Sequence, residues 1–201
     1  MAGINILIAI PTFETICPET FKSIYGLRRP GSAILTFDFI KGYDCAMARN
    51  KLAQEALDYG MDYVLMVDSD IILPSSTLVH MLEQPVDICL GVYPRKNTAT
   101  GQTEIFKKGF YNFTDKNNLN ASEIEEPGRL DIKGGGLGCA LINTEVFRKI
   151  PYPWFKYVQY DTGDVLSEDN YFCCIAADAG FSIQADTRIR CGHLIRTFVY
   201  E

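Results

Sequence analysis

The alternation of apolar runs with helical segments in the first 92 residues constrains the fold most strongly. Apart from Asn5, Asp62 and Asp87 at or near their starts, the runs 4–10, 62–67 and 86–92 are apolar, which is typical of strands buried on both faces of a sheet. A further strand is predicted at 32–40. Between these runs lie two segments with helical periodicity and capping residues, 44–60 and 74–84. The pattern predicts an α/β fold with a mixed, mostly parallel sheet flanked by helices.

The second half of the chain has a different organisation. Residues 94–132 are polar and contain a predicted hairpin, which is typical of a binding loop or lid inserted in a domain. Residues 133–201 then supply a glycine cluster, a strand, two helices that start near 144 and 167, and two late strands. At 201 residues, a single domain is expected.

Composition restricts the class of partner and the compartment. The net charge of -6 and the pI of about 5.0 argue against a nucleic-acid-binding protein. Seven cysteines without a CxxC pair are read as reduced thiols, and neither a secretory signal nor an apolar run of membrane-spanning length is visible. We therefore expect a cytoplasmic protein.

The stretch DYVLMVDSDIILP places two carboxylates, Asp68 and Asp70, directly after a buried strand. Residues i and i+2 of a strand point to the same side, so both carboxylates are expected to converge. Their repulsion calls for a counter-charge, and a hard divalent cation such as Mg²⁺ or Mn²⁺ would provide it. Two solvated aspartates in a turn are the alternative.

Three further features carry candidate chemistry. Glu168 and Asp169 follow Ser167 at a predicted helix start, where a carboxylate both complements the helix dipole and is placed to act as a general base. His193 follows a late strand and is either structural or a third metal ligand. Trp154 is either a core anchor or a surface for stacking on a sugar. Cations that are candidates for neutralising a diphosphate are Arg49, Arg95, Lys96, Arg188, Arg190 and Arg196.

The motifs in order resemble a GT-A fold glycosyltransferase of the family 2-like, nucleotide-sugar-dependent type. They are AIPTFE, ARNKLAQEAL, DYVLMVDSDIILP, GGGLGCALINTEVF, SEDNYFC and CGH. The resemblance covers nearly the whole chain and implies a Rossmann-like nucleotide-diphospho-sugar transferase fold. It implies a nucleotide-binding half at 1–93, the insertion at 94–132, and an acceptor and catalytic half at 133–201.

The resemblance also implies roles for individual residues. Asp169 would be the catalytic base of the ED motif, with Glu168 as a second candidate. Asp68, Asp70 and His193 would hold Mn²⁺ or Mg²⁺. The donor would contact a wider set of residues: Pro11, Thr12, Glu14, Asp38 after the second strand, Arg49, Asp68, the spacer Ser69, Asp70, Gly136 and Gly138.

The implied reaction moves a sugar from a UDP- or GDP-sugar to an acceptor hydroxyl on a glycan, a lipid-linked molecule or a protein. Inversion is favoured because a single base is identified, and retention is not excluded; a homo-oligomer is compatible with the sequence. A haloacid dehalogenase-like phosphatase that uses Asp68 and Asp70 is an alternative, although here Ile71 follows the pair and strands precede it. A non-catalytic nucleotide-sugar-binding module is the other alternative.

Overall fold

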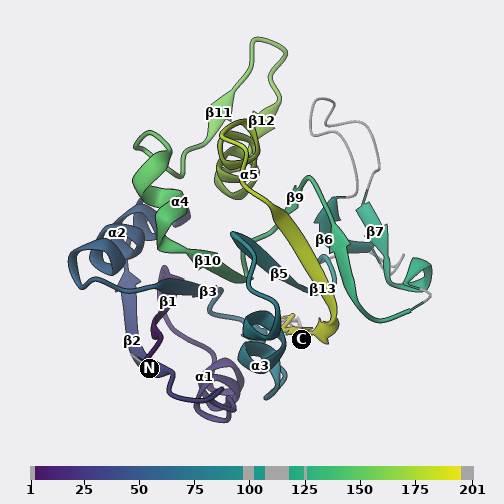
Figure 1. Cartoon of the computed structure of the whole chain (residues 1–201). Coiled ribbons are helices and arrows are strands. Elements are labelled where there is room, and N and C mark those ends of the chain that lie inside the picture. Colours follow the sequence, from purple (N-terminus) through teal and green to yellow (C-terminus); the bar gives the residue numbers. More distant parts are fainter. Residues whose placement is uncertain (1–2, 97–101, 107–117, 125, 196–201) are drawn as a thin grey trace, which may run out of the picture.

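The computed structural model describes residues 3–96, 102–106, 118–124 and 126–195, and its centre is a seven-stranded sheet (Figure 1). In spatial order the strands are β2 (Ile34–Lys41), β1 (Asn5–Thr12), β3 (Tyr63–Val67), β10 (Cys139–Asn143), β5 (Ile88–Val92), β13 (Ile183–Arg190) and β8 (Arg129–Asp131). Strands β10 and β8 run antiparallel to their neighbours, and the other neighbouring pairs are parallel. The predicted mixed, mostly parallel α/β sheet is confirmed.

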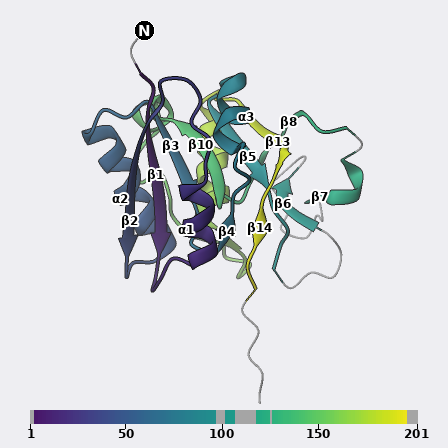
Figure 2. The same ribbon diagram turned by 90° about the horizontal axis from the view of Figure 1, so that it is seen from below.

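Helices cover both faces of this sheet. One face carries α2 (Cys45–Asp58), α4 (Thr144–Lys149) and α5 (Glu168–Asp178). The other carries α1 (Pro18–Tyr25) and α3 (Thr77–Glu83), which lie in front of the sheet in Figure 2.

The strand β1 shows why its sequence is apolar throughout. Leu7 and Ala9 pack into the core under α2, whereas Ile6, Ile8 and Ile10 pack into the core under α1 and α3. Successive side chains of a strand point to opposite faces, so a strand between two helical layers needs an apolar residue at every position.

Two of the predicted helix starts differ in how they are capped. The side chain of Asp44 accepts a hydrogen bond from the Met47 backbone N–H at 3.0 Å, as an N-cap should. Ser167 occupies the N-cap position of α5, but its hydroxyl donates to Asp169 and caps no backbone N–H. Helix α5 therefore begins where expected, without a side-chain cap from Ser167.

Two elements differ from the sequence-based expectation. Helix α1 is not predicted from the sequence. It has only eight residues, and its N-cap residue, Cys17, makes no capping hydrogen bond through its side chain. The two late strands are one continuous strand, β13, which is followed by β14 (Gly192–His193). Strand β14 pairs with β4 (Ile71–Ile72).

The polar segment 94–132 contributes to two sheets. Its described residues form β6 (Gln102–Phe106), β7 (Asn118–Asn120), the 3₁₀ turn Ala121–Glu123 and β8. Strand β6 pairs antiparallel with β7 and with β9 (Gly134–Gly135). The turn and second strand of the hairpin predicted at 103–113 lie outside the described residues. A second hairpin, β11 (Val158–Gln159) with β12 (Val165–Leu166), projects from the body of the molecule (Figure 1).

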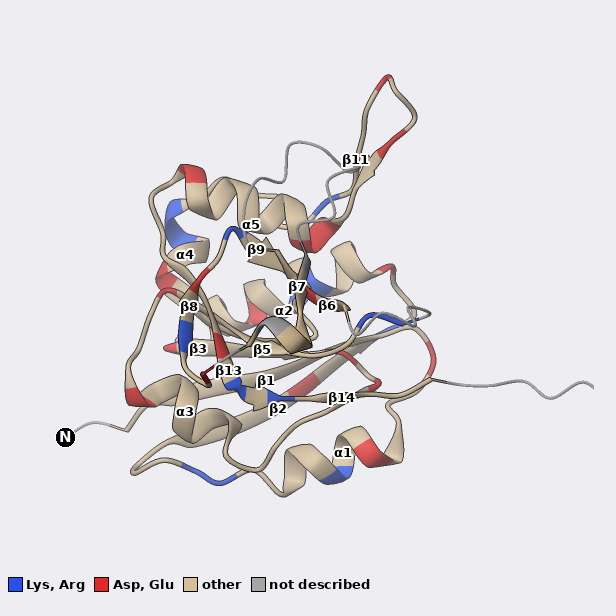
Figure 3. Ribbon diagram, turned by 90° about the vertical axis from the view of Figure 1, so that its right-hand side faces the viewer, with Lys and Arg blue, Asp and Glu red and all other residues tan. Residues whose placement is uncertain are grey.

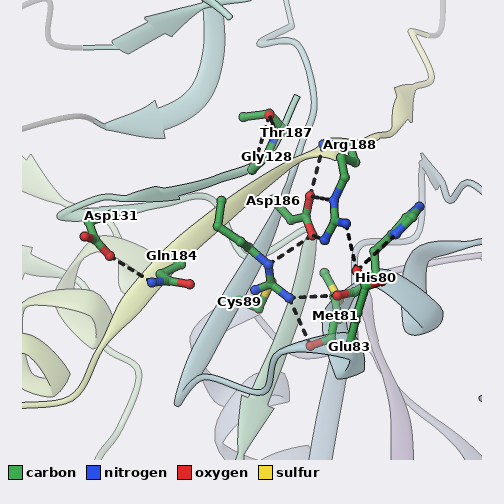
Figure 4. Close-up of polar contacts among 11 residues, drawn as sticks. His80, Met81, Glu83, Cys89, Gly128, Asp131, Gln184, Asp186, Thr187 and Arg188 are labelled. Atoms are coloured by element: carbon green, nitrogen blue, oxygen red, sulfur yellow. Dashed lines mark hydrogen bonds and ion pairs between the residues drawn. The ribbon is translucent and has the colours of Figure 1, made fainter. Parts of the chain in front are cut away.

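A buried ion cluster fixes the β8 edge of the sheet (Figure 4). The fully buried carboxylate of Asp186 accepts hydrogen bonds from Arg188 at 2.9 and 2.7 Å, and Arg129 Nε lies 3.0 Å from the same carboxylate. Arg188 also donates to Glu83 of α3 at 2.7 Å. Arg188 is therefore committed to this structural cluster and does not serve the candidate site.

Expectations about Trp154 and about the cysteines can be compared with the structure. Trp154 is 4% exposed, and its indole N–H donates to the carbonyl of Phe147 at 3.0 Å, so it is a core anchor. All seven cysteines have free thiols. Within the described ranges, no helix is long and apolar enough to cross a membrane.

Candidate functional site

The candidate residues gather at one edge of the central sheet. Parallel strands place their carboxyl ends together, and here β1 ends at Thr12, β3 runs into Asp68, and β5 runs into Tyr93. Strand β13 leads into β14, in which His193 pairs with Ile71, the residue that follows Asp70. In open α/β sheets ligands bind outside the carboxyl ends of the strands, so this edge is the place to look for a site.

Asp70 lies between the side chains of Lys96 and His193. Lys96 forms an ion pair with Asp70 Oδ2, and His193 Nε2 lies 3.6 Å from Asp70 Oδ1. Partial burial acts in the opposite direction, but the nearby His193 and the ion pair with Lys96 lower the pKa of Asp70 to about 2. Asp70 is therefore a permanently charged acceptor at neutral pH.

His193 is oriented by its second ring nitrogen. Its Nδ1 lies 2.8 Å from the carbonyl oxygen of Pro94, which can only accept, so Nδ1 carries a proton and Nε2 faces Asp70. The Tyr93 ring packs edge-on against the imidazole, with the centroids 5.4 Å apart. Burial opposes the effect, but the contacts with Asp70 and Pro94 raise the pKa of His193 above its ordinary value.

Asp68 points to a different partner. Arg49 Nη2 donates to Asp68 Oδ1 at 2.6 Å, and Arg49 Nε lies 3.9 Å from Glu168 Oε1. Arg49 is 2% exposed and the Asp68 side chain 32%, so water screens this ion pair less than it screens a surface pair. Burial alone would lower the pKa of Arg49, but the anionic groups around it, including Asp68 and Glu168, hold it well above its ordinary value.

The segment 68–70 is a turn rather than an extension of β3, because the Ile71 N–H donates to the Asp68 carbonyl at 3.1 Å. The two carboxylates consequently have separate protein partners and do not meet in a single ion pair. Ser69 between them uses its carbonyl to accept the Cys17 N–H at 2.9 Å, which ties the turn to the start of α1.

Asp169 combines burial with a raised pKa. Burial, together with the neighbouring charge of Glu168, raises its pKa to about 6, even though Arg49, Ser167 and the Asn170 N–H act the other way. A carboxylate with a pKa close to the working pH is well suited to accept and release a proton. Glu168 is 7% exposed and lies against Arg49.

The glycines make room for Tyr93. The buried Tyr93 hydroxyl accepts the Gly138 N–H at 3.0 Å. A Cβ at Gly136 would lie 2.2 Å from Tyr93 Oη, and one at Gly138 would lie 2.8 Å from Asp68 Oδ2. Both positions therefore need glycine for the close approach of protein groups.

A cavity of about 410 Å³ opens beside Asp70. Its lining comes from the end of β1, the turn after β3 and the residues that follow β5 and β14: Thr12, Phe13, Glu14, Thr15, Cys17, Ser69, Asp70, Lys96, Leu194 and Ile195. A cavity of this size, with a few charged groups on an otherwise mixed wall, has the dimensions of a small-molecule site.

The predicted donor residues divide into two groups. Thr12, Glu14, Ser69 and Asp70 line the cavity, while Arg49, Gly136 and Gly138 pack behind it around Asp68 and Tyr93. Pro11 is buried in β1.

Asp38 occupies a different position from the one predicted. It lies within β2 opposite Ala9, rather than after the strand, and its carboxylate accepts its neighbour's backbone N–H at 2.7 Å. Arg196 and Glu201 lie outside the described residues.

The donor set fits a divalent metal in part. Asp70 and the Nε2 face of His193 converge, and Mg²⁺ or Mn²⁺ is commonly held by one or two protein ligands with substrate phosphates. Asp68 is engaged by Arg49. Within the part of the chain that the structure describes, no group of three or more His, Cys, Asp and Glu side chains is gathered closely enough to hold a metal ion.

Sequence reasoning missed Tyr93, which links Gly138 to His193. Its position directly after β5, at the carboxyl edge of the sheet, is the signal that would have found it. Lys96 was identified only as one of several cations, because its pairing with Asp70 depends on the path of the chain after β5.

Comparison with known proteins shows similarity in structure only. No protein-family model matches the sequence, and no curated protein matches it significantly. Among solved structures, A197 from STIV is similar with a TM-score of 0.65 and 17% identity, over 96% of this chain and 87% of that one.

Two glycosyltransferase structures are similar over 96% of this chain. S. aureus TarS in complex with UDP-GlcNAc gives a TM-score of 0.55 and 13% identity over 60% of its chain. GalNAc-T7 with UDP, GalNAc and Mn²⁺ gives a TM-score of 0.58 and 11% identity over 44% of its chain. The chain thus spans less than two thirds of these two relatives, and the likeness establishes a shared fold, that of the GT-A glycosyltransferases.

Proposed function

We propose that the chain is a glycosyltransferase that moves a sugar from a nucleoside-diphosphate sugar to an acceptor hydroxyl. The observation that carries the proposal is the cavity with Asp70 and Lys96 on its wall, in contact with His193 and at the carboxyl edge of a GT-A sheet. Fold alone does not fix function, whereas this arrangement of charges is specific to the chemistry of a phosphate-bearing ligand.

The donor would lie in this cavity. Thr12 and Glu14 offer polar groups for a base and ribose. Lys96 carries a positive charge on a flexible side chain at the cavity wall, where it could contact the diphosphate of a donor. UDP is the first nucleotide to test, because TarS and GalNAc-T7 were both crystallised with UDP or a UDP-sugar. GDP-sugars are the second choice.

Asp70 and His193 would hold a divalent metal, with Asp68 as the third ligand if it exchanges Arg49 for the ion. Bound Mn²⁺ or Mg²⁺ would neutralise charge that develops on the departing diphosphate. The hydrogen bond from Nδ1 to Pro94 keeps the His193 Nε2 face directed at Asp70, which is the orientation that a metal-binding histidine needs.

Asp169 would accept the proton of the attacking acceptor hydroxyl. Its pKa of about 6 makes it ionised at neutral pH and still basic enough to take a proton as the glycosidic bond forms. Glu168 would hold Arg49 in place. A single base and attack from the face opposite the leaving group favour inversion.

The test is a thermal-shift screen of UDP- and GDP-sugars with Mn²⁺ or with EDTA, followed by an assay of sugar transfer and of donor hydrolysis. A ligand that binds the native state raises the melting temperature. We expect stabilisation by one donor with Mn²⁺, loss of that effect in Asp70→Asn, and binding without turnover in Asp169→Asn. Asp178→Asn, on the exposed end of α5, is the matched control.

Other outcomes would favour the alternatives. Donor binding that is unchanged in EDTA and in Asp70→Asn would contradict the metal role. Hydrolysis of p-nitrophenyl phosphate without nucleotide would favour a phosphatase, and donor binding without turnover of any acceptor or of water would favour a binding module.

A further inference from the structure

A patch of aromatic and basic side chains lies away from the candidate site, on α1, the loop after it and β2. We call it the aromatic–basic face, and its members are Phe21, Lys22, Tyr25, Arg28, Arg29 and Phe37. Its aromatic side chains are exposed to solvent: Tyr25 is 85% exposed, Phe21 52% and Phe37 39%. The rings of Phe21 and Phe37 pack edge-to-face with centroids 6.1 Å apart, which makes one continuous aromatic surface.

The charges of this face are opposite in sign to those of the whole protein. Residues 17–31 contain three basic residues against the single acid Glu19, in a chain of net charge -6. Lys22 lies on α1, and Arg28 and Arg29 lie on the following loop (Figure 3). All three are exposed, and none forms an ion pair with another residue in the described ranges.

The face also contains an apolar groove. A cavity of about 530 Å³ runs between α1 and β2, and its walls include Phe21, Ile24, Tyr25, Leu27, Leu35 and Phe37. Arg29 lies at the same groove, so apolar surface and positive charge meet there.

We propose that the aromatic–basic face docks on the surface of an anionic lipid bilayer. Lys and Arg side chains near such a surface are attracted by its negative potential, and Phe and Tyr insert at the level of the headgroups. A nucleic-acid duplex would satisfy the basic residues, but its bases are stacked inside the helix, so it would leave the groove and the exposed rings without an apolar partner. The proposal is independent of the reaction proposed above.

Helix α1 links the aromatic–basic face to the candidate site. Helix α1 begins immediately after Cys17, which lines the cavity beside Asp70, and ends at Tyr25 in the aromatic–basic face. One eight-residue helix therefore connects the two surfaces.

The test is flotation of the full chain with phosphatidylcholine vesicles that contain or lack phosphatidylglycerol. We expect binding only to the anionic vesicles, and weaker binding at high salt, because screening shortens the reach of the surface potential. Each basic residue near an anionic surface contributes about fivefold, so Lys22→Gln/Arg28→Gln/Arg29→Gln should bind about a hundredfold more weakly. Phe21→Ser/Tyr25→Ser should also lose binding while it keeps all three charges.

The control removes three exposed lysines elsewhere, Lys51→Gln/Lys133→Gln/Lys149→Gln, and should change vesicle binding by much less. All substituted side chains are exposed, so circular dichroism and melting temperature should stay unchanged. Absence of binding to anionic vesicles, or an equal loss in the control, would overturn the proposal. So would binding to a DNA duplex that competes with vesicles and does not respond to Phe21→Ser/Tyr25→Ser.

Discussion

Arg49 and Asp68 form a short, partly buried ion pair, with 2.6 Å between Nη2 and Oδ1; the arginine is 2% exposed and the aspartate side chain 32%. The pair connects the second turn of α2 to the end of β3, and Glu168 at the start of α5 lies on the other side of the same guanidinium. One side chain thus holds together three elements that border the candidate site.

Arg49→Met should destabilise the protein strongly, because it leaves two carboxylates near a core without a counter-charge. Removal of one partner of a buried pair typically costs about 3–5 kcal/mol. Urea unfolding measures the change. Arg148→Met, which breaks an exposed pair with Glu145, is the matched control and should cost less than about 1 kcal/mol. Equal losses in the two variants would contradict the structural role of Arg49.

Gly138→Ala should weaken donor binding while the protein stays folded. The new methyl group would lie 2.8 Å from Asp68 Oδ2 and 2.9 Å from Tyr93 Oη, so the carboxylate or the ring must move. We expect the donor affinity, measured by calorimetry, to fall more than about tenfold, because small displacements of groups in a site have effects of this order. Gly128→Ala has open space around its Cβ and should bind donor normally.

The activity should fall as the pH drops through about 6, because Asp169 must be ionised to accept a proton and its pKa is raised to about 6. The pH profile of kcat/KM for donor transfer measures this. A profile that stays flat down to pH 5 would remove Asp169 as the base.

Asp169 also links pH to stability. Its pKa is higher in the folded than in the unfolded state, so its contribution is fully present below the unfolded-state value and is lost as the pH rises through about 6. Asp169→Asn, which stays uncharged, should therefore be more stable than the parent protein at pH 8, by an amount of order 2 kcal/mol, and no more stable at pH 4. Melting temperatures at the two pH values decide this.

Asp186 should show the opposite pH dependence. Burial would raise its pKa, but hydrogen bonds from Arg188 and the charge of Arg129 outweigh burial and lower it. Its stabilising contribution is therefore present above the unfolded-state pKa of about 3.9 and is lost as the pH falls below that value. The free energy of unfolding of the parent protein should fall between about pH 4 and pH 2 as Asp186 becomes protonated. Asp186→Asn has no such group to protonate, so its free energy of unfolding should fall less over this range. An acid-unfolding curve identical to that of the parent would contradict the assignment.

The apolar strands and the Asp68–Asp70 stretch were predictable because they depend on local pattern. A strand between two helical layers needs apolar side chains on both faces, and the sequences of β3, of β5 and of β1 between Asn5 and Thr12 show this. Helix α2 was predictable for the same reason, since Asp44 provides a local cap. The sequence by itself therefore determined the α/β class and the edge of the sheet where polar residues gather.

Only the tertiary structure decided which of those polar residues meet. The pairings of Asp68 with Arg49 and of Asp70 with Lys96 and His193 join residues that are distant in the chain, and no spacing rule encodes them. Arg188 near His193 in sequence is drawn instead to the buried Asp186, because a buried charge must be paired where it lies. Local pattern fixes what each segment is, and the three-dimensional path of the chain fixes which charges neutralise one another.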